Sequence, residues 1–197
     1  MLDLIVATHN RGKMREINSL LADMPIEVRC LTDVDPDFTV VEDGETFAEN
    51  AIKKAEAVAV RFNCAALADD SGLCVDALDG RPGVYSARFA GEGASDGENN
   101  QKLLAMLADT EERTARFVCV MALAMPGQKT ETVEGICAGR IVSELSGDGG
   151  FGYDPLFVPQ GYEETFARLG SGVKNTISHR AKALHMMKER IASMEGL

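Results

Sequence analysis

The sequence has little positive charge for its length. Its 197 residues include 20 Lys and Arg against 31 Asp and Glu, which gives a formal net charge of −11 at pH 7. Proteins that bind nucleic acid or an anionic membrane over a broad surface need a basic stripe. The acidic balance argues against nucleic-acid and membrane partners. An anionic substrate would have to be met by a local group of cations or by a metal ion.

The chain also lacks the cysteine spacings of a disulfide framework or a zinc site. Its five cysteines form no C-x-x-C pair and are odd in number, which is typical of reduced, mostly buried thiols. The first ten residues, MLDLIVATHN, have no basic n-region of a signal peptide. No apolar run approaches the roughly 18 residues of a membrane span. These absences predict a cytoplasmic protein.

Several common catalytic signatures are missing as well. There is no G-x-S-x-G elbow, no dinucleotide-binding G-x-G-x-x-G after a strand, and no complete Walker A loop. Hydrophobic residues nevertheless make up 45% of the chain, which is enough for a buried core. The length predicts one domain, or one domain with two lobes.

Strand-like and helix-like apolar patterns intermix along the chain. Leu2–Ala7 and Ala115–Met125 read as buried strands, and Phe47–Phe62 has helical spacing. Ser95 and Glu98 fit a capping box at the start of another helix. This mixture predicts an α/β class with a mixed sheet. Further expected elements are strands at Glu27–Leu31, Ala65–Ala68, Val75–Leu78 and 129–142, and a last helix from about Ser178 that carries Met194.

The segment ATHNRGKMREI, residues 7–17, joins the first expected strand to a helix. A helix N-terminus presents unpaired backbone N–H groups and the positive end of a dipole, and both suit phosphate. Thr8 and Asn10 can cap or donate, and Lys13 can add a full charge. The pattern is compatible with a phosphate cradle. Taken alone, it favours an ordinary capped helix with a surface lysine.

The segment ADDSG, residues 68–72, follows a short apolar strand. Acids at strand ends lie where α/β proteins usually place ligands. One carboxylate could bind a divalent cation or take a proton from an attacking water, whereas the structural alternative is an Asx-type turn. Because adjacent strand residues point to opposite faces, only one of Asp69 and Asp70 is expected to face a site.

Two later segments also carry residues suited to a ligand. In GGFGYDP, residues 149–155, glycines flank an aromatic ring that could stack on a flat ligand; the alternative is a turn with Phe151 or Tyr153 in the core. In KNTISHR, residues 174–180, Lys174, His179 and Arg180 stand at the entry to the last helix. They would form an anion or carbonyl site there, although each residue alone would usually be solvated.

Taken in order, these segments resemble the inosine triphosphate pyrophosphatase family, whose members act on unusual purine nucleoside triphosphates. Each block is weak alone, but six in order across nearly the whole chain are specific. The matching blocks are T-x-N-x-x-K (Thr8, Asn10, Lys13), T-F-x-E-N-A-x-x-K-A (Thr46–Ala55), A-D-D-S-G-L (Ala68–Leu73), P-G-x-Y-S-A-R (Pro82–Arg88), G-G-F-G-Y-D-P and S-H-R.

The resemblance implies a fold and an activity. The fold would be an elongated, two-lobed α/β structure with a mixed, bent central sheet flanked by helices and a substrate cleft between the lobes. Residues 1–197 would form a single nucleoside triphosphate pyrophosphatase domain, usually found as a homodimer. The enzyme would use Mg²⁺ to hydrolyse ITP, dITP and XTP to the monophosphate and pyrophosphate, and so remove them from the nucleotide pool.

The resemblance also implies roles for individual residues. Asp70 matches the catalytic carboxylate and a metal ligand, and Glu42 matches a second metal-binding acid. The implied phosphate-side contacts are Thr8, His9, Asn10, Arg11, Gly12, Lys13, Lys54 and Ser71. The implied nucleoside-side contacts are Phe151, Gly152, Tyr153, Asp154, Lys174, His179 and Arg180.

This chain departs from the family pattern at two places. RLGSGV precedes Lys174 where an acidic helical turn is common, and Ala181 replaces a glycine after S-H-R. Two other functions compete with the main hypothesis. A Maf-type nucleotide pyrophosphatase is disfavoured by the F-G-Y-D and S-H-R blocks, and a non-catalytic nucleotide-binding module is disfavoured by the presence of both Asp70 and Lys13.

Overall fold

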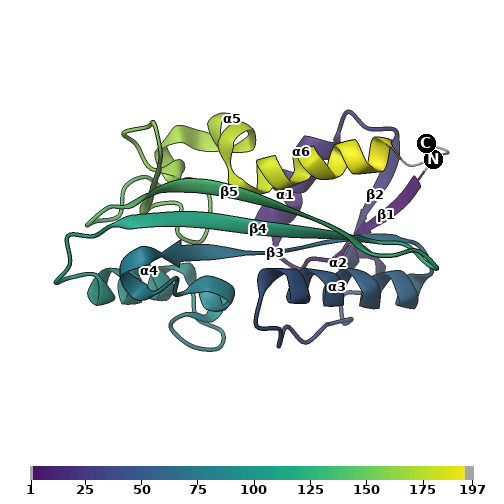
Figure 1. The fold of residues 1–197 in the computed structure, drawn as a ribbon, viewed down its shortest axis with the longest axis horizontal. Coiled ribbons are helices and arrows are strands. Elements are labelled where there is room, and N and C mark those ends of the chain that lie inside the picture. The colour runs from purple at the N-terminus through teal and green to yellow at the C-terminus, as the bar shows by residue number, and fades with distance from the viewer. Residues whose placement is uncertain (1, 194–197) are drawn as a thin grey trace. The chain divides into compact units, whose positions relative to one another are not determined.

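The computed structural model describes residues 2–193 and shows an α/β fold (Figure 1). Met194, expected on the last helix, lies outside the described residues. The strands are β1 (Leu2–Val6), β2 (Ile26–Cys30), β3 (Ala65–Val75), β4 (Thr114–Ala124), β5 (Glu131–Ile141) and β6 (Phe157–Pro159). The α-helices are α1 (Arg11–Leu21), α2 (Leu31–Val34), α3 (Phe47–Phe62), α4 (Asp96–Met106), α5 (Phe166–Ile177) and α6 (His179–Ala192), with 3₁₀ turns at Asp76–Leu78 and Gly83–Arg88.

The six strands form one sheet in the order β2-β1-β3-β4-β5-β6. Strand β1 pairs in parallel with both β2 and β3, whereas β5 and β6 are antiparallel. The sheet is therefore mixed, which confirms the predicted class. No helix within residues 2–193 is long and apolar enough to cross a membrane.

The chain divides into two compact units. Unit 1 comprises residues 1–70, 119–135 and 180–197, and unit 2 comprises residues 71–118 and 136–179. Strands β3, β4 and β5 each contribute residues to both units. Two lobes were predicted, and the division into two units agrees with them; the substrate cleft expected between them stays a prediction.

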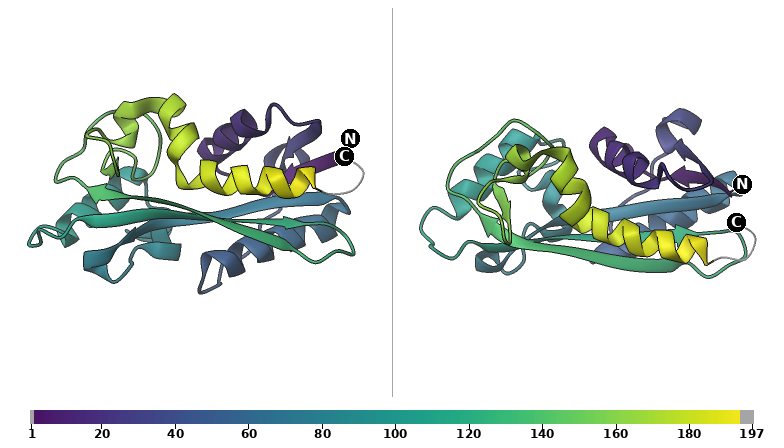
Figure 2. Two further views of the ribbon diagram at one scale, coloured as in Figure 1. Left: turned by 45° about the horizontal axis from the view of Figure 1, so that its top comes forward. Right: turned by 90° about the horizontal axis from the view of Figure 1, so that it is seen from above.

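Unit 1 has a hydrophobic layer on each face of its strands. Alternating residues of β1 and β3 point to opposite faces, so Leu4 and Leu67 join one core cluster while Ile5 and Ala66 join another. Helices α1 and α6 cover the first face and α3 covers the second (Figures 1 and 2). This alternation also decides which face each acid at the end of the apolar run will occupy.

Unit 2 is built around a separate core rich in aromatic side chains. Phe117, Phe157 and Phe166 pack together, with ring centroids 4.7 Å apart for the first two and 5.5 Å apart for the last two. Leu103 and Leu107 join them from α4 and the residue after it. The predicted capping box is confirmed here, since the Ser95 hydroxyl accepts from the Glu98 N–H and the Glu98 carboxylate accepts from the Ser95 N–H.

The structure corrects three parts of the expected element map. The strand expected at Val75–Leu78 is wrong, because β3 ends at Val75 and Asp76–Leu78 form a 3₁₀ turn. The D-D-S-G segment was treated as the end of a short strand or an Asx-type turn, but β3 continues through it to Val75. All residues of β3 except Ser71 are buried, so burial in the sheet outweighs the local turn preference of Asp, Ser and Gly. Helix α5 and the short strand β6 were not predicted; α5 is interrupted at Gly170, where φ is +75°.

Candidate active site

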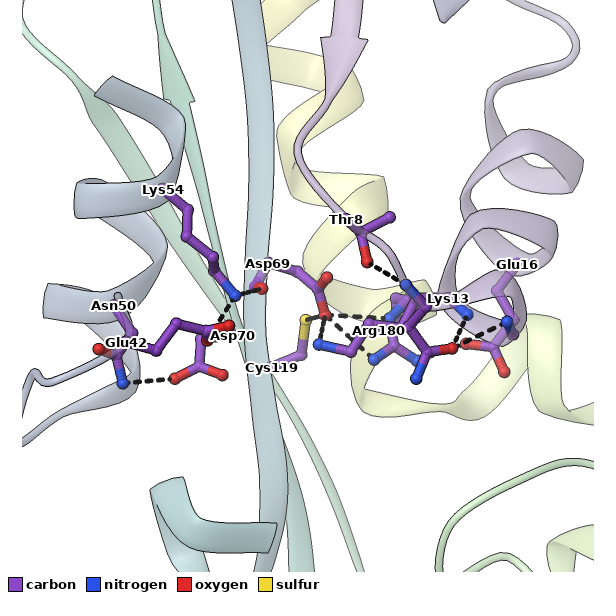
Figure 3. A network of polar contacts seen from close by, with 12 residues as sticks. Thr8, Lys13, Glu16, Glu42, Asn50, Lys54, Asp69, Asp70, Cys119 and Arg180 are labelled. Atoms are coloured by element: carbon purple, nitrogen blue, oxygen red, sulfur yellow. Dashed lines mark hydrogen bonds and ion pairs between the residues drawn. The ribbon is translucent and has the colours of Figure 1, made fainter. Parts of the chain in front are cut away.

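Asp69 and Asp70 lie on opposite sides of β3, as the strand period predicts (Figure 3). Both belong to unit 1 and both are buried, with exposed fractions of 1% and 7%. Their surroundings differ. Asp70 points toward α3 and the segment before it, whereas Asp69 points toward α1, α6 and β4 (Figure 3). The two neighbouring carboxylates therefore belong to two separate polar networks.

The Asp70 network brings together an amide, an amine and a second carboxylate. Asn50 Nδ2 donates to Asp70 Oδ2 at 3.0 Å. Lys54 Nζ donates to Glu42 Oε2 at 2.8 Å and to the Asp69 carbonyl oxygen, also at 2.8 Å. Because Asn50 and Lys54 are four residues apart on α3, they share one face of the helix. This face supplies the donors that surround the two acids.

Burial and charge act in opposite directions on this side of β3. Burial raises the pKa of Asp70 above its ordinary 3.8, and nearby Lys54 and Lys13 offset the rise only in part. Burial acts to lower the pKa of Lys54, but Asp69, Glu42 and Asp70 outweigh it and the net change is a raised pKa. Lys54 therefore stays charged, and Asp70 binds a proton more readily than an exposed aspartate does.

The Asp69 network is a buried cluster of opposite charges. Lys13 Nζ lies 3.0 Å from Asp69 Oδ2, and Arg180 Nη2 lies 3.1 Å from the same oxygen. Arg180 also donates through Nη1 to Glu16, three residues after Lys13 on α1. The Cys119 thiol lies 4.0 Å from Asp69 Oδ2. Figure 3 shows these side chains converging from β3, β4, α1 and α6.

The electrostatics of this cluster favour the charged forms of Asp69 and Arg180 and the neutral form of Cys119. Burial acts to raise the pKa of Asp69, but Lys13 and Arg180 outweigh it and hold that pKa well below the ordinary range. Burial acts to lower the pKa of Arg180, and the attraction of Asp69 and Glu16 raises it instead. Burial raises the pKa of the Cys119 thiol to about 12, so it stays protonated and is not a nucleophile.

The start of α1 was compatible with a phosphate cradle or with an ordinary capped helix, and the structure shows the cap. Asn10 caps the helix, and its side-chain oxygen accepts from the N–H groups of Gly12 at 2.8 Å and Lys13 at 3.0 Å. The Thr8 hydroxyl accepts from the Asn10 N–H at 3.1 Å. The cap is thus confirmed, but Lys13 is turned inward to Asp69 and is not a surface lysine. His9 and Arg11, also predicted here, are exposed.

In unit 2, a second group forms around Asp154. Its Oδ2 accepts from the Phe151 N–H at 2.9 Å and from Lys174 Nζ at 2.5 Å. The same ammonium lies over the Phe151 ring, 4.4 Å from the centroid. Lys174 reaches this position from α5, after the interruption at Gly170 that accommodates the unusual RLGSGV segment. The structure thus joins three of the predicted nucleoside-side residues.

The glycine-rich loop is held tightly from within unit 2. Tyr153 is buried and its hydroxyl donates to the Ser86 carbonyl oxygen at 2.8 Å, so the core alternative is correct for this ring. Phe151 is only half-buried. Asn100 Nδ2 donates to the Gly152 carbonyl oxygen at 3.0 Å, while Asp96 accepts from the Gly152 N–H at 2.7 Å. The loop presents Phe151 from a fixed backbone.

The remaining predicted residues fall into different surroundings. The ring of His179 stacks on Phe117 at 4.7 Å between centroids, and its side chain is almost wholly buried in unit 2. Arg180, the next residue, belongs to unit 1 and to the Asp69 network. Ser71 follows Asp70 on β3 and is half-buried in unit 2. His185, on α6, is exposed.

Sequence reasoning missed three residues of these networks: Asn50, Glu16 and Cys119. A signal existed for two of them, because Asn50 is four residues before Lys54 and Glu16 is three residues after Lys13, spacings that place each pair on one helix face. Cys119 gave no such signal, because it stands within an apolar run and its contact with Asp69 joins residues that are 50 positions apart in the sequence.

The donor set on the Asp70 side suits a magnesium ion. Glu42 and Asp70 supply two carboxylates, and Mg²⁺ in nucleotide enzymes commonly takes one or two protein carboxylates and completes its shell with phosphate and water. Within residues 2–193, no three His, Cys, Asp or Glu side chains gather to hold a metal by themselves. Glu42 and Asp70 would therefore fit a magnesium ion as two protein ligands, with phosphate oxygens and water as the rest of its shell.

The fold and the networks around Asp69 and Asp70 define an α/β protein with a group of carboxylates and lysines around β3. Comparison with known proteins places it more closely. The model of the Ham1 family matches residues 4–190. The chain therefore belongs to the Ham1 family.

Individual relatives agree with this assignment. The chain is 53% identical over 191 residues to a protein of Desulforamulus reducens named dITP/XTP pyrophosphatase, covering 95% of this chain and 94% of that one. It is 49% identical over 193 residues to a protein of the same name from Shouchella clausii, covering 97% of each chain. A solved Ham1 protein from Coxiella burnetii superposes with a TM-score of 0.90 at 39% identity, covering 98% of this chain and 100% of that one.

Proposed function

We propose that this chain is a magnesium-dependent nucleoside triphosphate pyrophosphatase that hydrolyses ITP, dITP and XTP to the monophosphate and pyrophosphate. Residues 1–197 would act as one catalytic domain that clears unusual purine nucleotides from the pool. Two relatives about half identical to the chain carry the name dITP/XTP pyrophosphatase. The observation that carries the proposal is the pairing of Asp70 and Glu42 beside Lys54 on one side of β3.

Asp70 is the proposed proton acceptor. Water attacks the α-phosphorus in line, the bond from that phosphorus to the bridging oxygen breaks, and pyrophosphate leaves in one piece. The proton of the attacking water passes to the Asp70 carboxylate. The raised pKa of Asp70 supports this role, because a general base works best when its pKa is brought toward the working pH.

Magnesium is the proposed cofactor, with Glu42 and Asp70 as its protein ligands. When bound, it would neutralise phosphate charge and orient the reacting oxygens. Lys54 holds the Glu42 carboxylate at 2.8 Å and keeps its own positive charge, so it also lowers the repulsion between two acids and an incoming triphosphate. A local cluster of this kind is what an acidic protein needs in order to accept an anionic substrate.

The other phosphate-side residues are proposed at the start of α1 and next to Asp70. Lys13 carries a charge at the helix start, where the dipole favours anions. The chain reaches Lys13 through the other predicted residues Thr8, His9, Asn10, Arg11 and Gly12, and Ser71 follows the catalytic acid. The Asn10 side chain already accepts hydrogen bonds from two N–H groups at this helix end, those of Gly12 and Lys13. Phosphate binding here would therefore rely on the Lys13 side chain and its neighbours.

The nucleoside is proposed to contact the residues of unit 2. Phe151 would stack on the purine, and Lys174 would donate to the 6-oxo group that hypoxanthine and xanthine carry and adenine lacks. Gly152, Tyr153, Asp154 and His179 would support them. Arg180 contacts Asp69 and Glu16, which supports a role in neutralising buried charge; its contact with the nucleoside rests on the family resemblance alone.

Two further parts of the proposal come from the resemblance: a homodimer, and a location in the cytoplasm. Light scattering on the purified chain would test the first, since a dimer must have twice the 21.2 kDa mass of the chain. Fractionation of cells that express the tagged protein would test the second. A monomer across micromolar concentrations, or recovery outside the cytoplasmic fraction, would reject the respective part.

A substrate panel tests the activity itself. ITP, dITP, XTP, GTP and ATP are each supplied with magnesium, and pyrophosphate and orthophosphate are read separately. In water labelled with ¹⁸O, attack at the α-phosphorus places the label in the monophosphate. Pyrophosphate from the first three nucleotides, with label in the monophosphate, supports the proposal. Orthophosphate as the first product, or binding without turnover, would reject it.

A further inference from the structure

Asn50 contacts both Asp70 and the backbone of Gly44, two residues after Glu42. Its Nδ2 donates to Asp70 Oδ2 at 3.0 Å, and its Oδ1 accepts from the Gly44 N–H at 2.8 Å. The same Nδ2 also lies 3.5 Å from the Gly44 carbonyl oxygen. One carboxamide thus binds both β3, through Asp70, and the segment that carries Glu42, through Gly44. Glu42 lies two residues before Gly44 in the chain.

The side chain is well placed to fix both partners. Asn50 is 1% exposed and sits on the first turn of α3, whose own N-terminus is closed by the Thr46 and Glu49 capping box. A capped, buried helix turn is a rigid base for a side chain. Lys54, one helical turn later, holds the Glu42 carboxylate itself. Asn50 therefore binds the backbone of the Glu42 segment at Gly44, and Lys54 binds the Glu42 carboxylate.

Packing around Gly44 shows how closely this segment fits the carboxamide. A Cβ built on Gly44 would lie 2.7 Å from Asn50 Oδ1 and 2.9 Å from the Glu49 Cβ. Gly44 is absent from the positive-φ glycines of the described chain, so its backbone alone does not require glycine. The missing side chain leaves room for the Asn50 contact.

We infer that Asn50 is a positioning residue that sets Asp70 and the Glu42 segment in one arrangement, so that both carboxylates can receive a divalent cation together. The inference rests on the proposed magnesium-dependent function and deepens it. Groups that orient metal ligands through hydrogen bonds typically change metal affinity or activity about 10–100-fold when they are removed. Asn50 would act through Asp70 and Glu42, without touching the substrate.

The test compares Asn50→Ala with Gly44→Ala, which disturbs the same contact from the loop side. Binding of Mn²⁺ is followed by electron paramagnetic resonance in the presence of α,β-methylene inosine triphosphate, so that no turnover is needed. We expect each variant to weaken Mn²⁺ binding about 10–100-fold. With ITP and saturating magnesium, we expect kcat to fall while KM for the nucleotide stays close to that of the wild type.

Asn99→Ala is the matched control. Asn99 is also a buried helical asparagine whose carboxamide holds a loop, through the Ala87 carbonyl oxygen and the Ala90 N–H, but it belongs to unit 2 and contacts neither acid. It should lose stability like Asn50→Ala while keeping the wild-type Mn²⁺ affinity. If Asn50→Ala does not fold, Gly44→Ala decides.

Three results would overturn the inference: unchanged Mn²⁺ binding in the folded Asn50 and Gly44 variants, an equal loss in Asn99→Ala, or no Mn²⁺ binding by the wild type. The proposed function fails separately, if the wild type releases no pyrophosphate from any nucleotide. In that case a selective loss of Mn²⁺ binding in the two variants would still support Asn50 as the residue that positions the two acids.

Discussion

The two units handle charge in different ways. In unit 1, Asp69 is surrounded by Lys13 and Arg180, while Asp70 on the other side of β3 is held by an amide and stands near a second acid. In unit 2, the buried pair of Lys174 and Asp154 lies against aromatic rings. The first unit concentrates charge that a metal and phosphates could use. The second presents a ring and one cation, which suits a flat, uncharged base.

The comparison inside unit 1 is as informative. Asp69 and Asp70 are consecutive and both buried, yet their pKa values move in opposite directions, down for Asp69 and up for Asp70. Because adjacent strand residues point to opposite faces, Asp69 faces Lys13 and Arg180, whereas Asp70 faces a site where nearby charges offset its burial only in part. We therefore assign structural work to Asp69 and chemistry to Asp70, and the predictions below test that division.

The largest effect is expected for Asp70→Asn. The substitution keeps the shape of the side chain but removes the carboxylate that accepts a proton and binds metal, so turnover of ITP should fall at least 10²–10⁴-fold, roughly the contribution of a general base. Because burial raises the pKa of Asp70, its charge is not a source of stability, and the variant should unfold at or above the wild-type temperature. Near-normal turnover at saturating magnesium would show that Asp70 is not the catalytic carboxylate.

Asp69→Asn should show the reverse pattern. Removing one member of a buried ion cluster leaves Arg180 and Lys13 without their main counter-charge, which typically costs about 3–5 kcal/mol of unfolding free energy. The folded-state pKa of Asp69 is depressed, so its contribution is present above the ordinary value of 3.8 and is lost as pH falls through the folded pKa.

Urea unfolding at neutral pH and below about pH 3.8 measures both parts of this prediction. The gap between wild type and Asp69→Asn should be wide at neutral pH and narrower in acid. A variant as stable as the wild type at neutral pH would show that the cluster is not structural. A larger loss of turnover than in Asp70→Asn, with the fold intact, would mean that the roles of the two acids are reversed.

Lys13→Ala should weaken the triphosphate far more than the monophosphate. Loss of a charge-assisted contact costs about 1.5–3 kcal/mol, and the proposed partner of Lys13 is a phosphate that inosine monophosphate lacks. Calorimetric binding of α,β-methylene inosine triphosphate and of inosine monophosphate measures the difference. A matched control is Lys53→Ala on α3, since Lys53 pairs only at the surface with Asp43. Equal weakening of both ligands would remove Lys13 from the phosphate side.

The smallest effect is expected for Phe151→Ala. Stacking on a base is worth about 1–3 kcal/mol and is tolerant of base identity, so kcat/KM should fall together for ITP, GTP and ATP. Phe89→Ala, which removes a half-buried ring over Lys102 elsewhere in unit 2, is the control. A loss confined to ITP would show that Phe151 selects the base and does more than stack.

Much of this arrangement could be predicted from local pattern. Period-two alternation was enough to separate Asp69 from Asp70, apolar spacing located α3, and the capping signal at Ser95 located the start of α4. Local pattern failed at D-D-S-G, where turn-forming residues lie inside the 11-residue strand β3, which is buried over almost its whole length.

The inward turn of Lys13 could not be predicted in the same way. Its partners are Asp69 on a distant strand and, through that carboxylate, Arg180 at the other end of the chain. Sequence spacing reports contacts within a helix or a strand, whereas these contacts arise only when α1, β3 and α6 pack together. The same holds for the Lys174 and Asp154 pair, which depends on an interruption of α5 at Gly170.

The most direct test of the division between the units uses two minimal probes, inorganic triphosphate and the nucleoside inosine. Calorimetry gives the affinity of each probe for the wild type, Lys13→Ala and Phe151→Ala. We expect a crossed result: Lys13→Ala weakens triphosphate by about 1.5–3 kcal/mol and spares inosine, while Phe151→Ala weakens inosine and spares triphosphate. Parallel losses of both probes in either variant would contradict it.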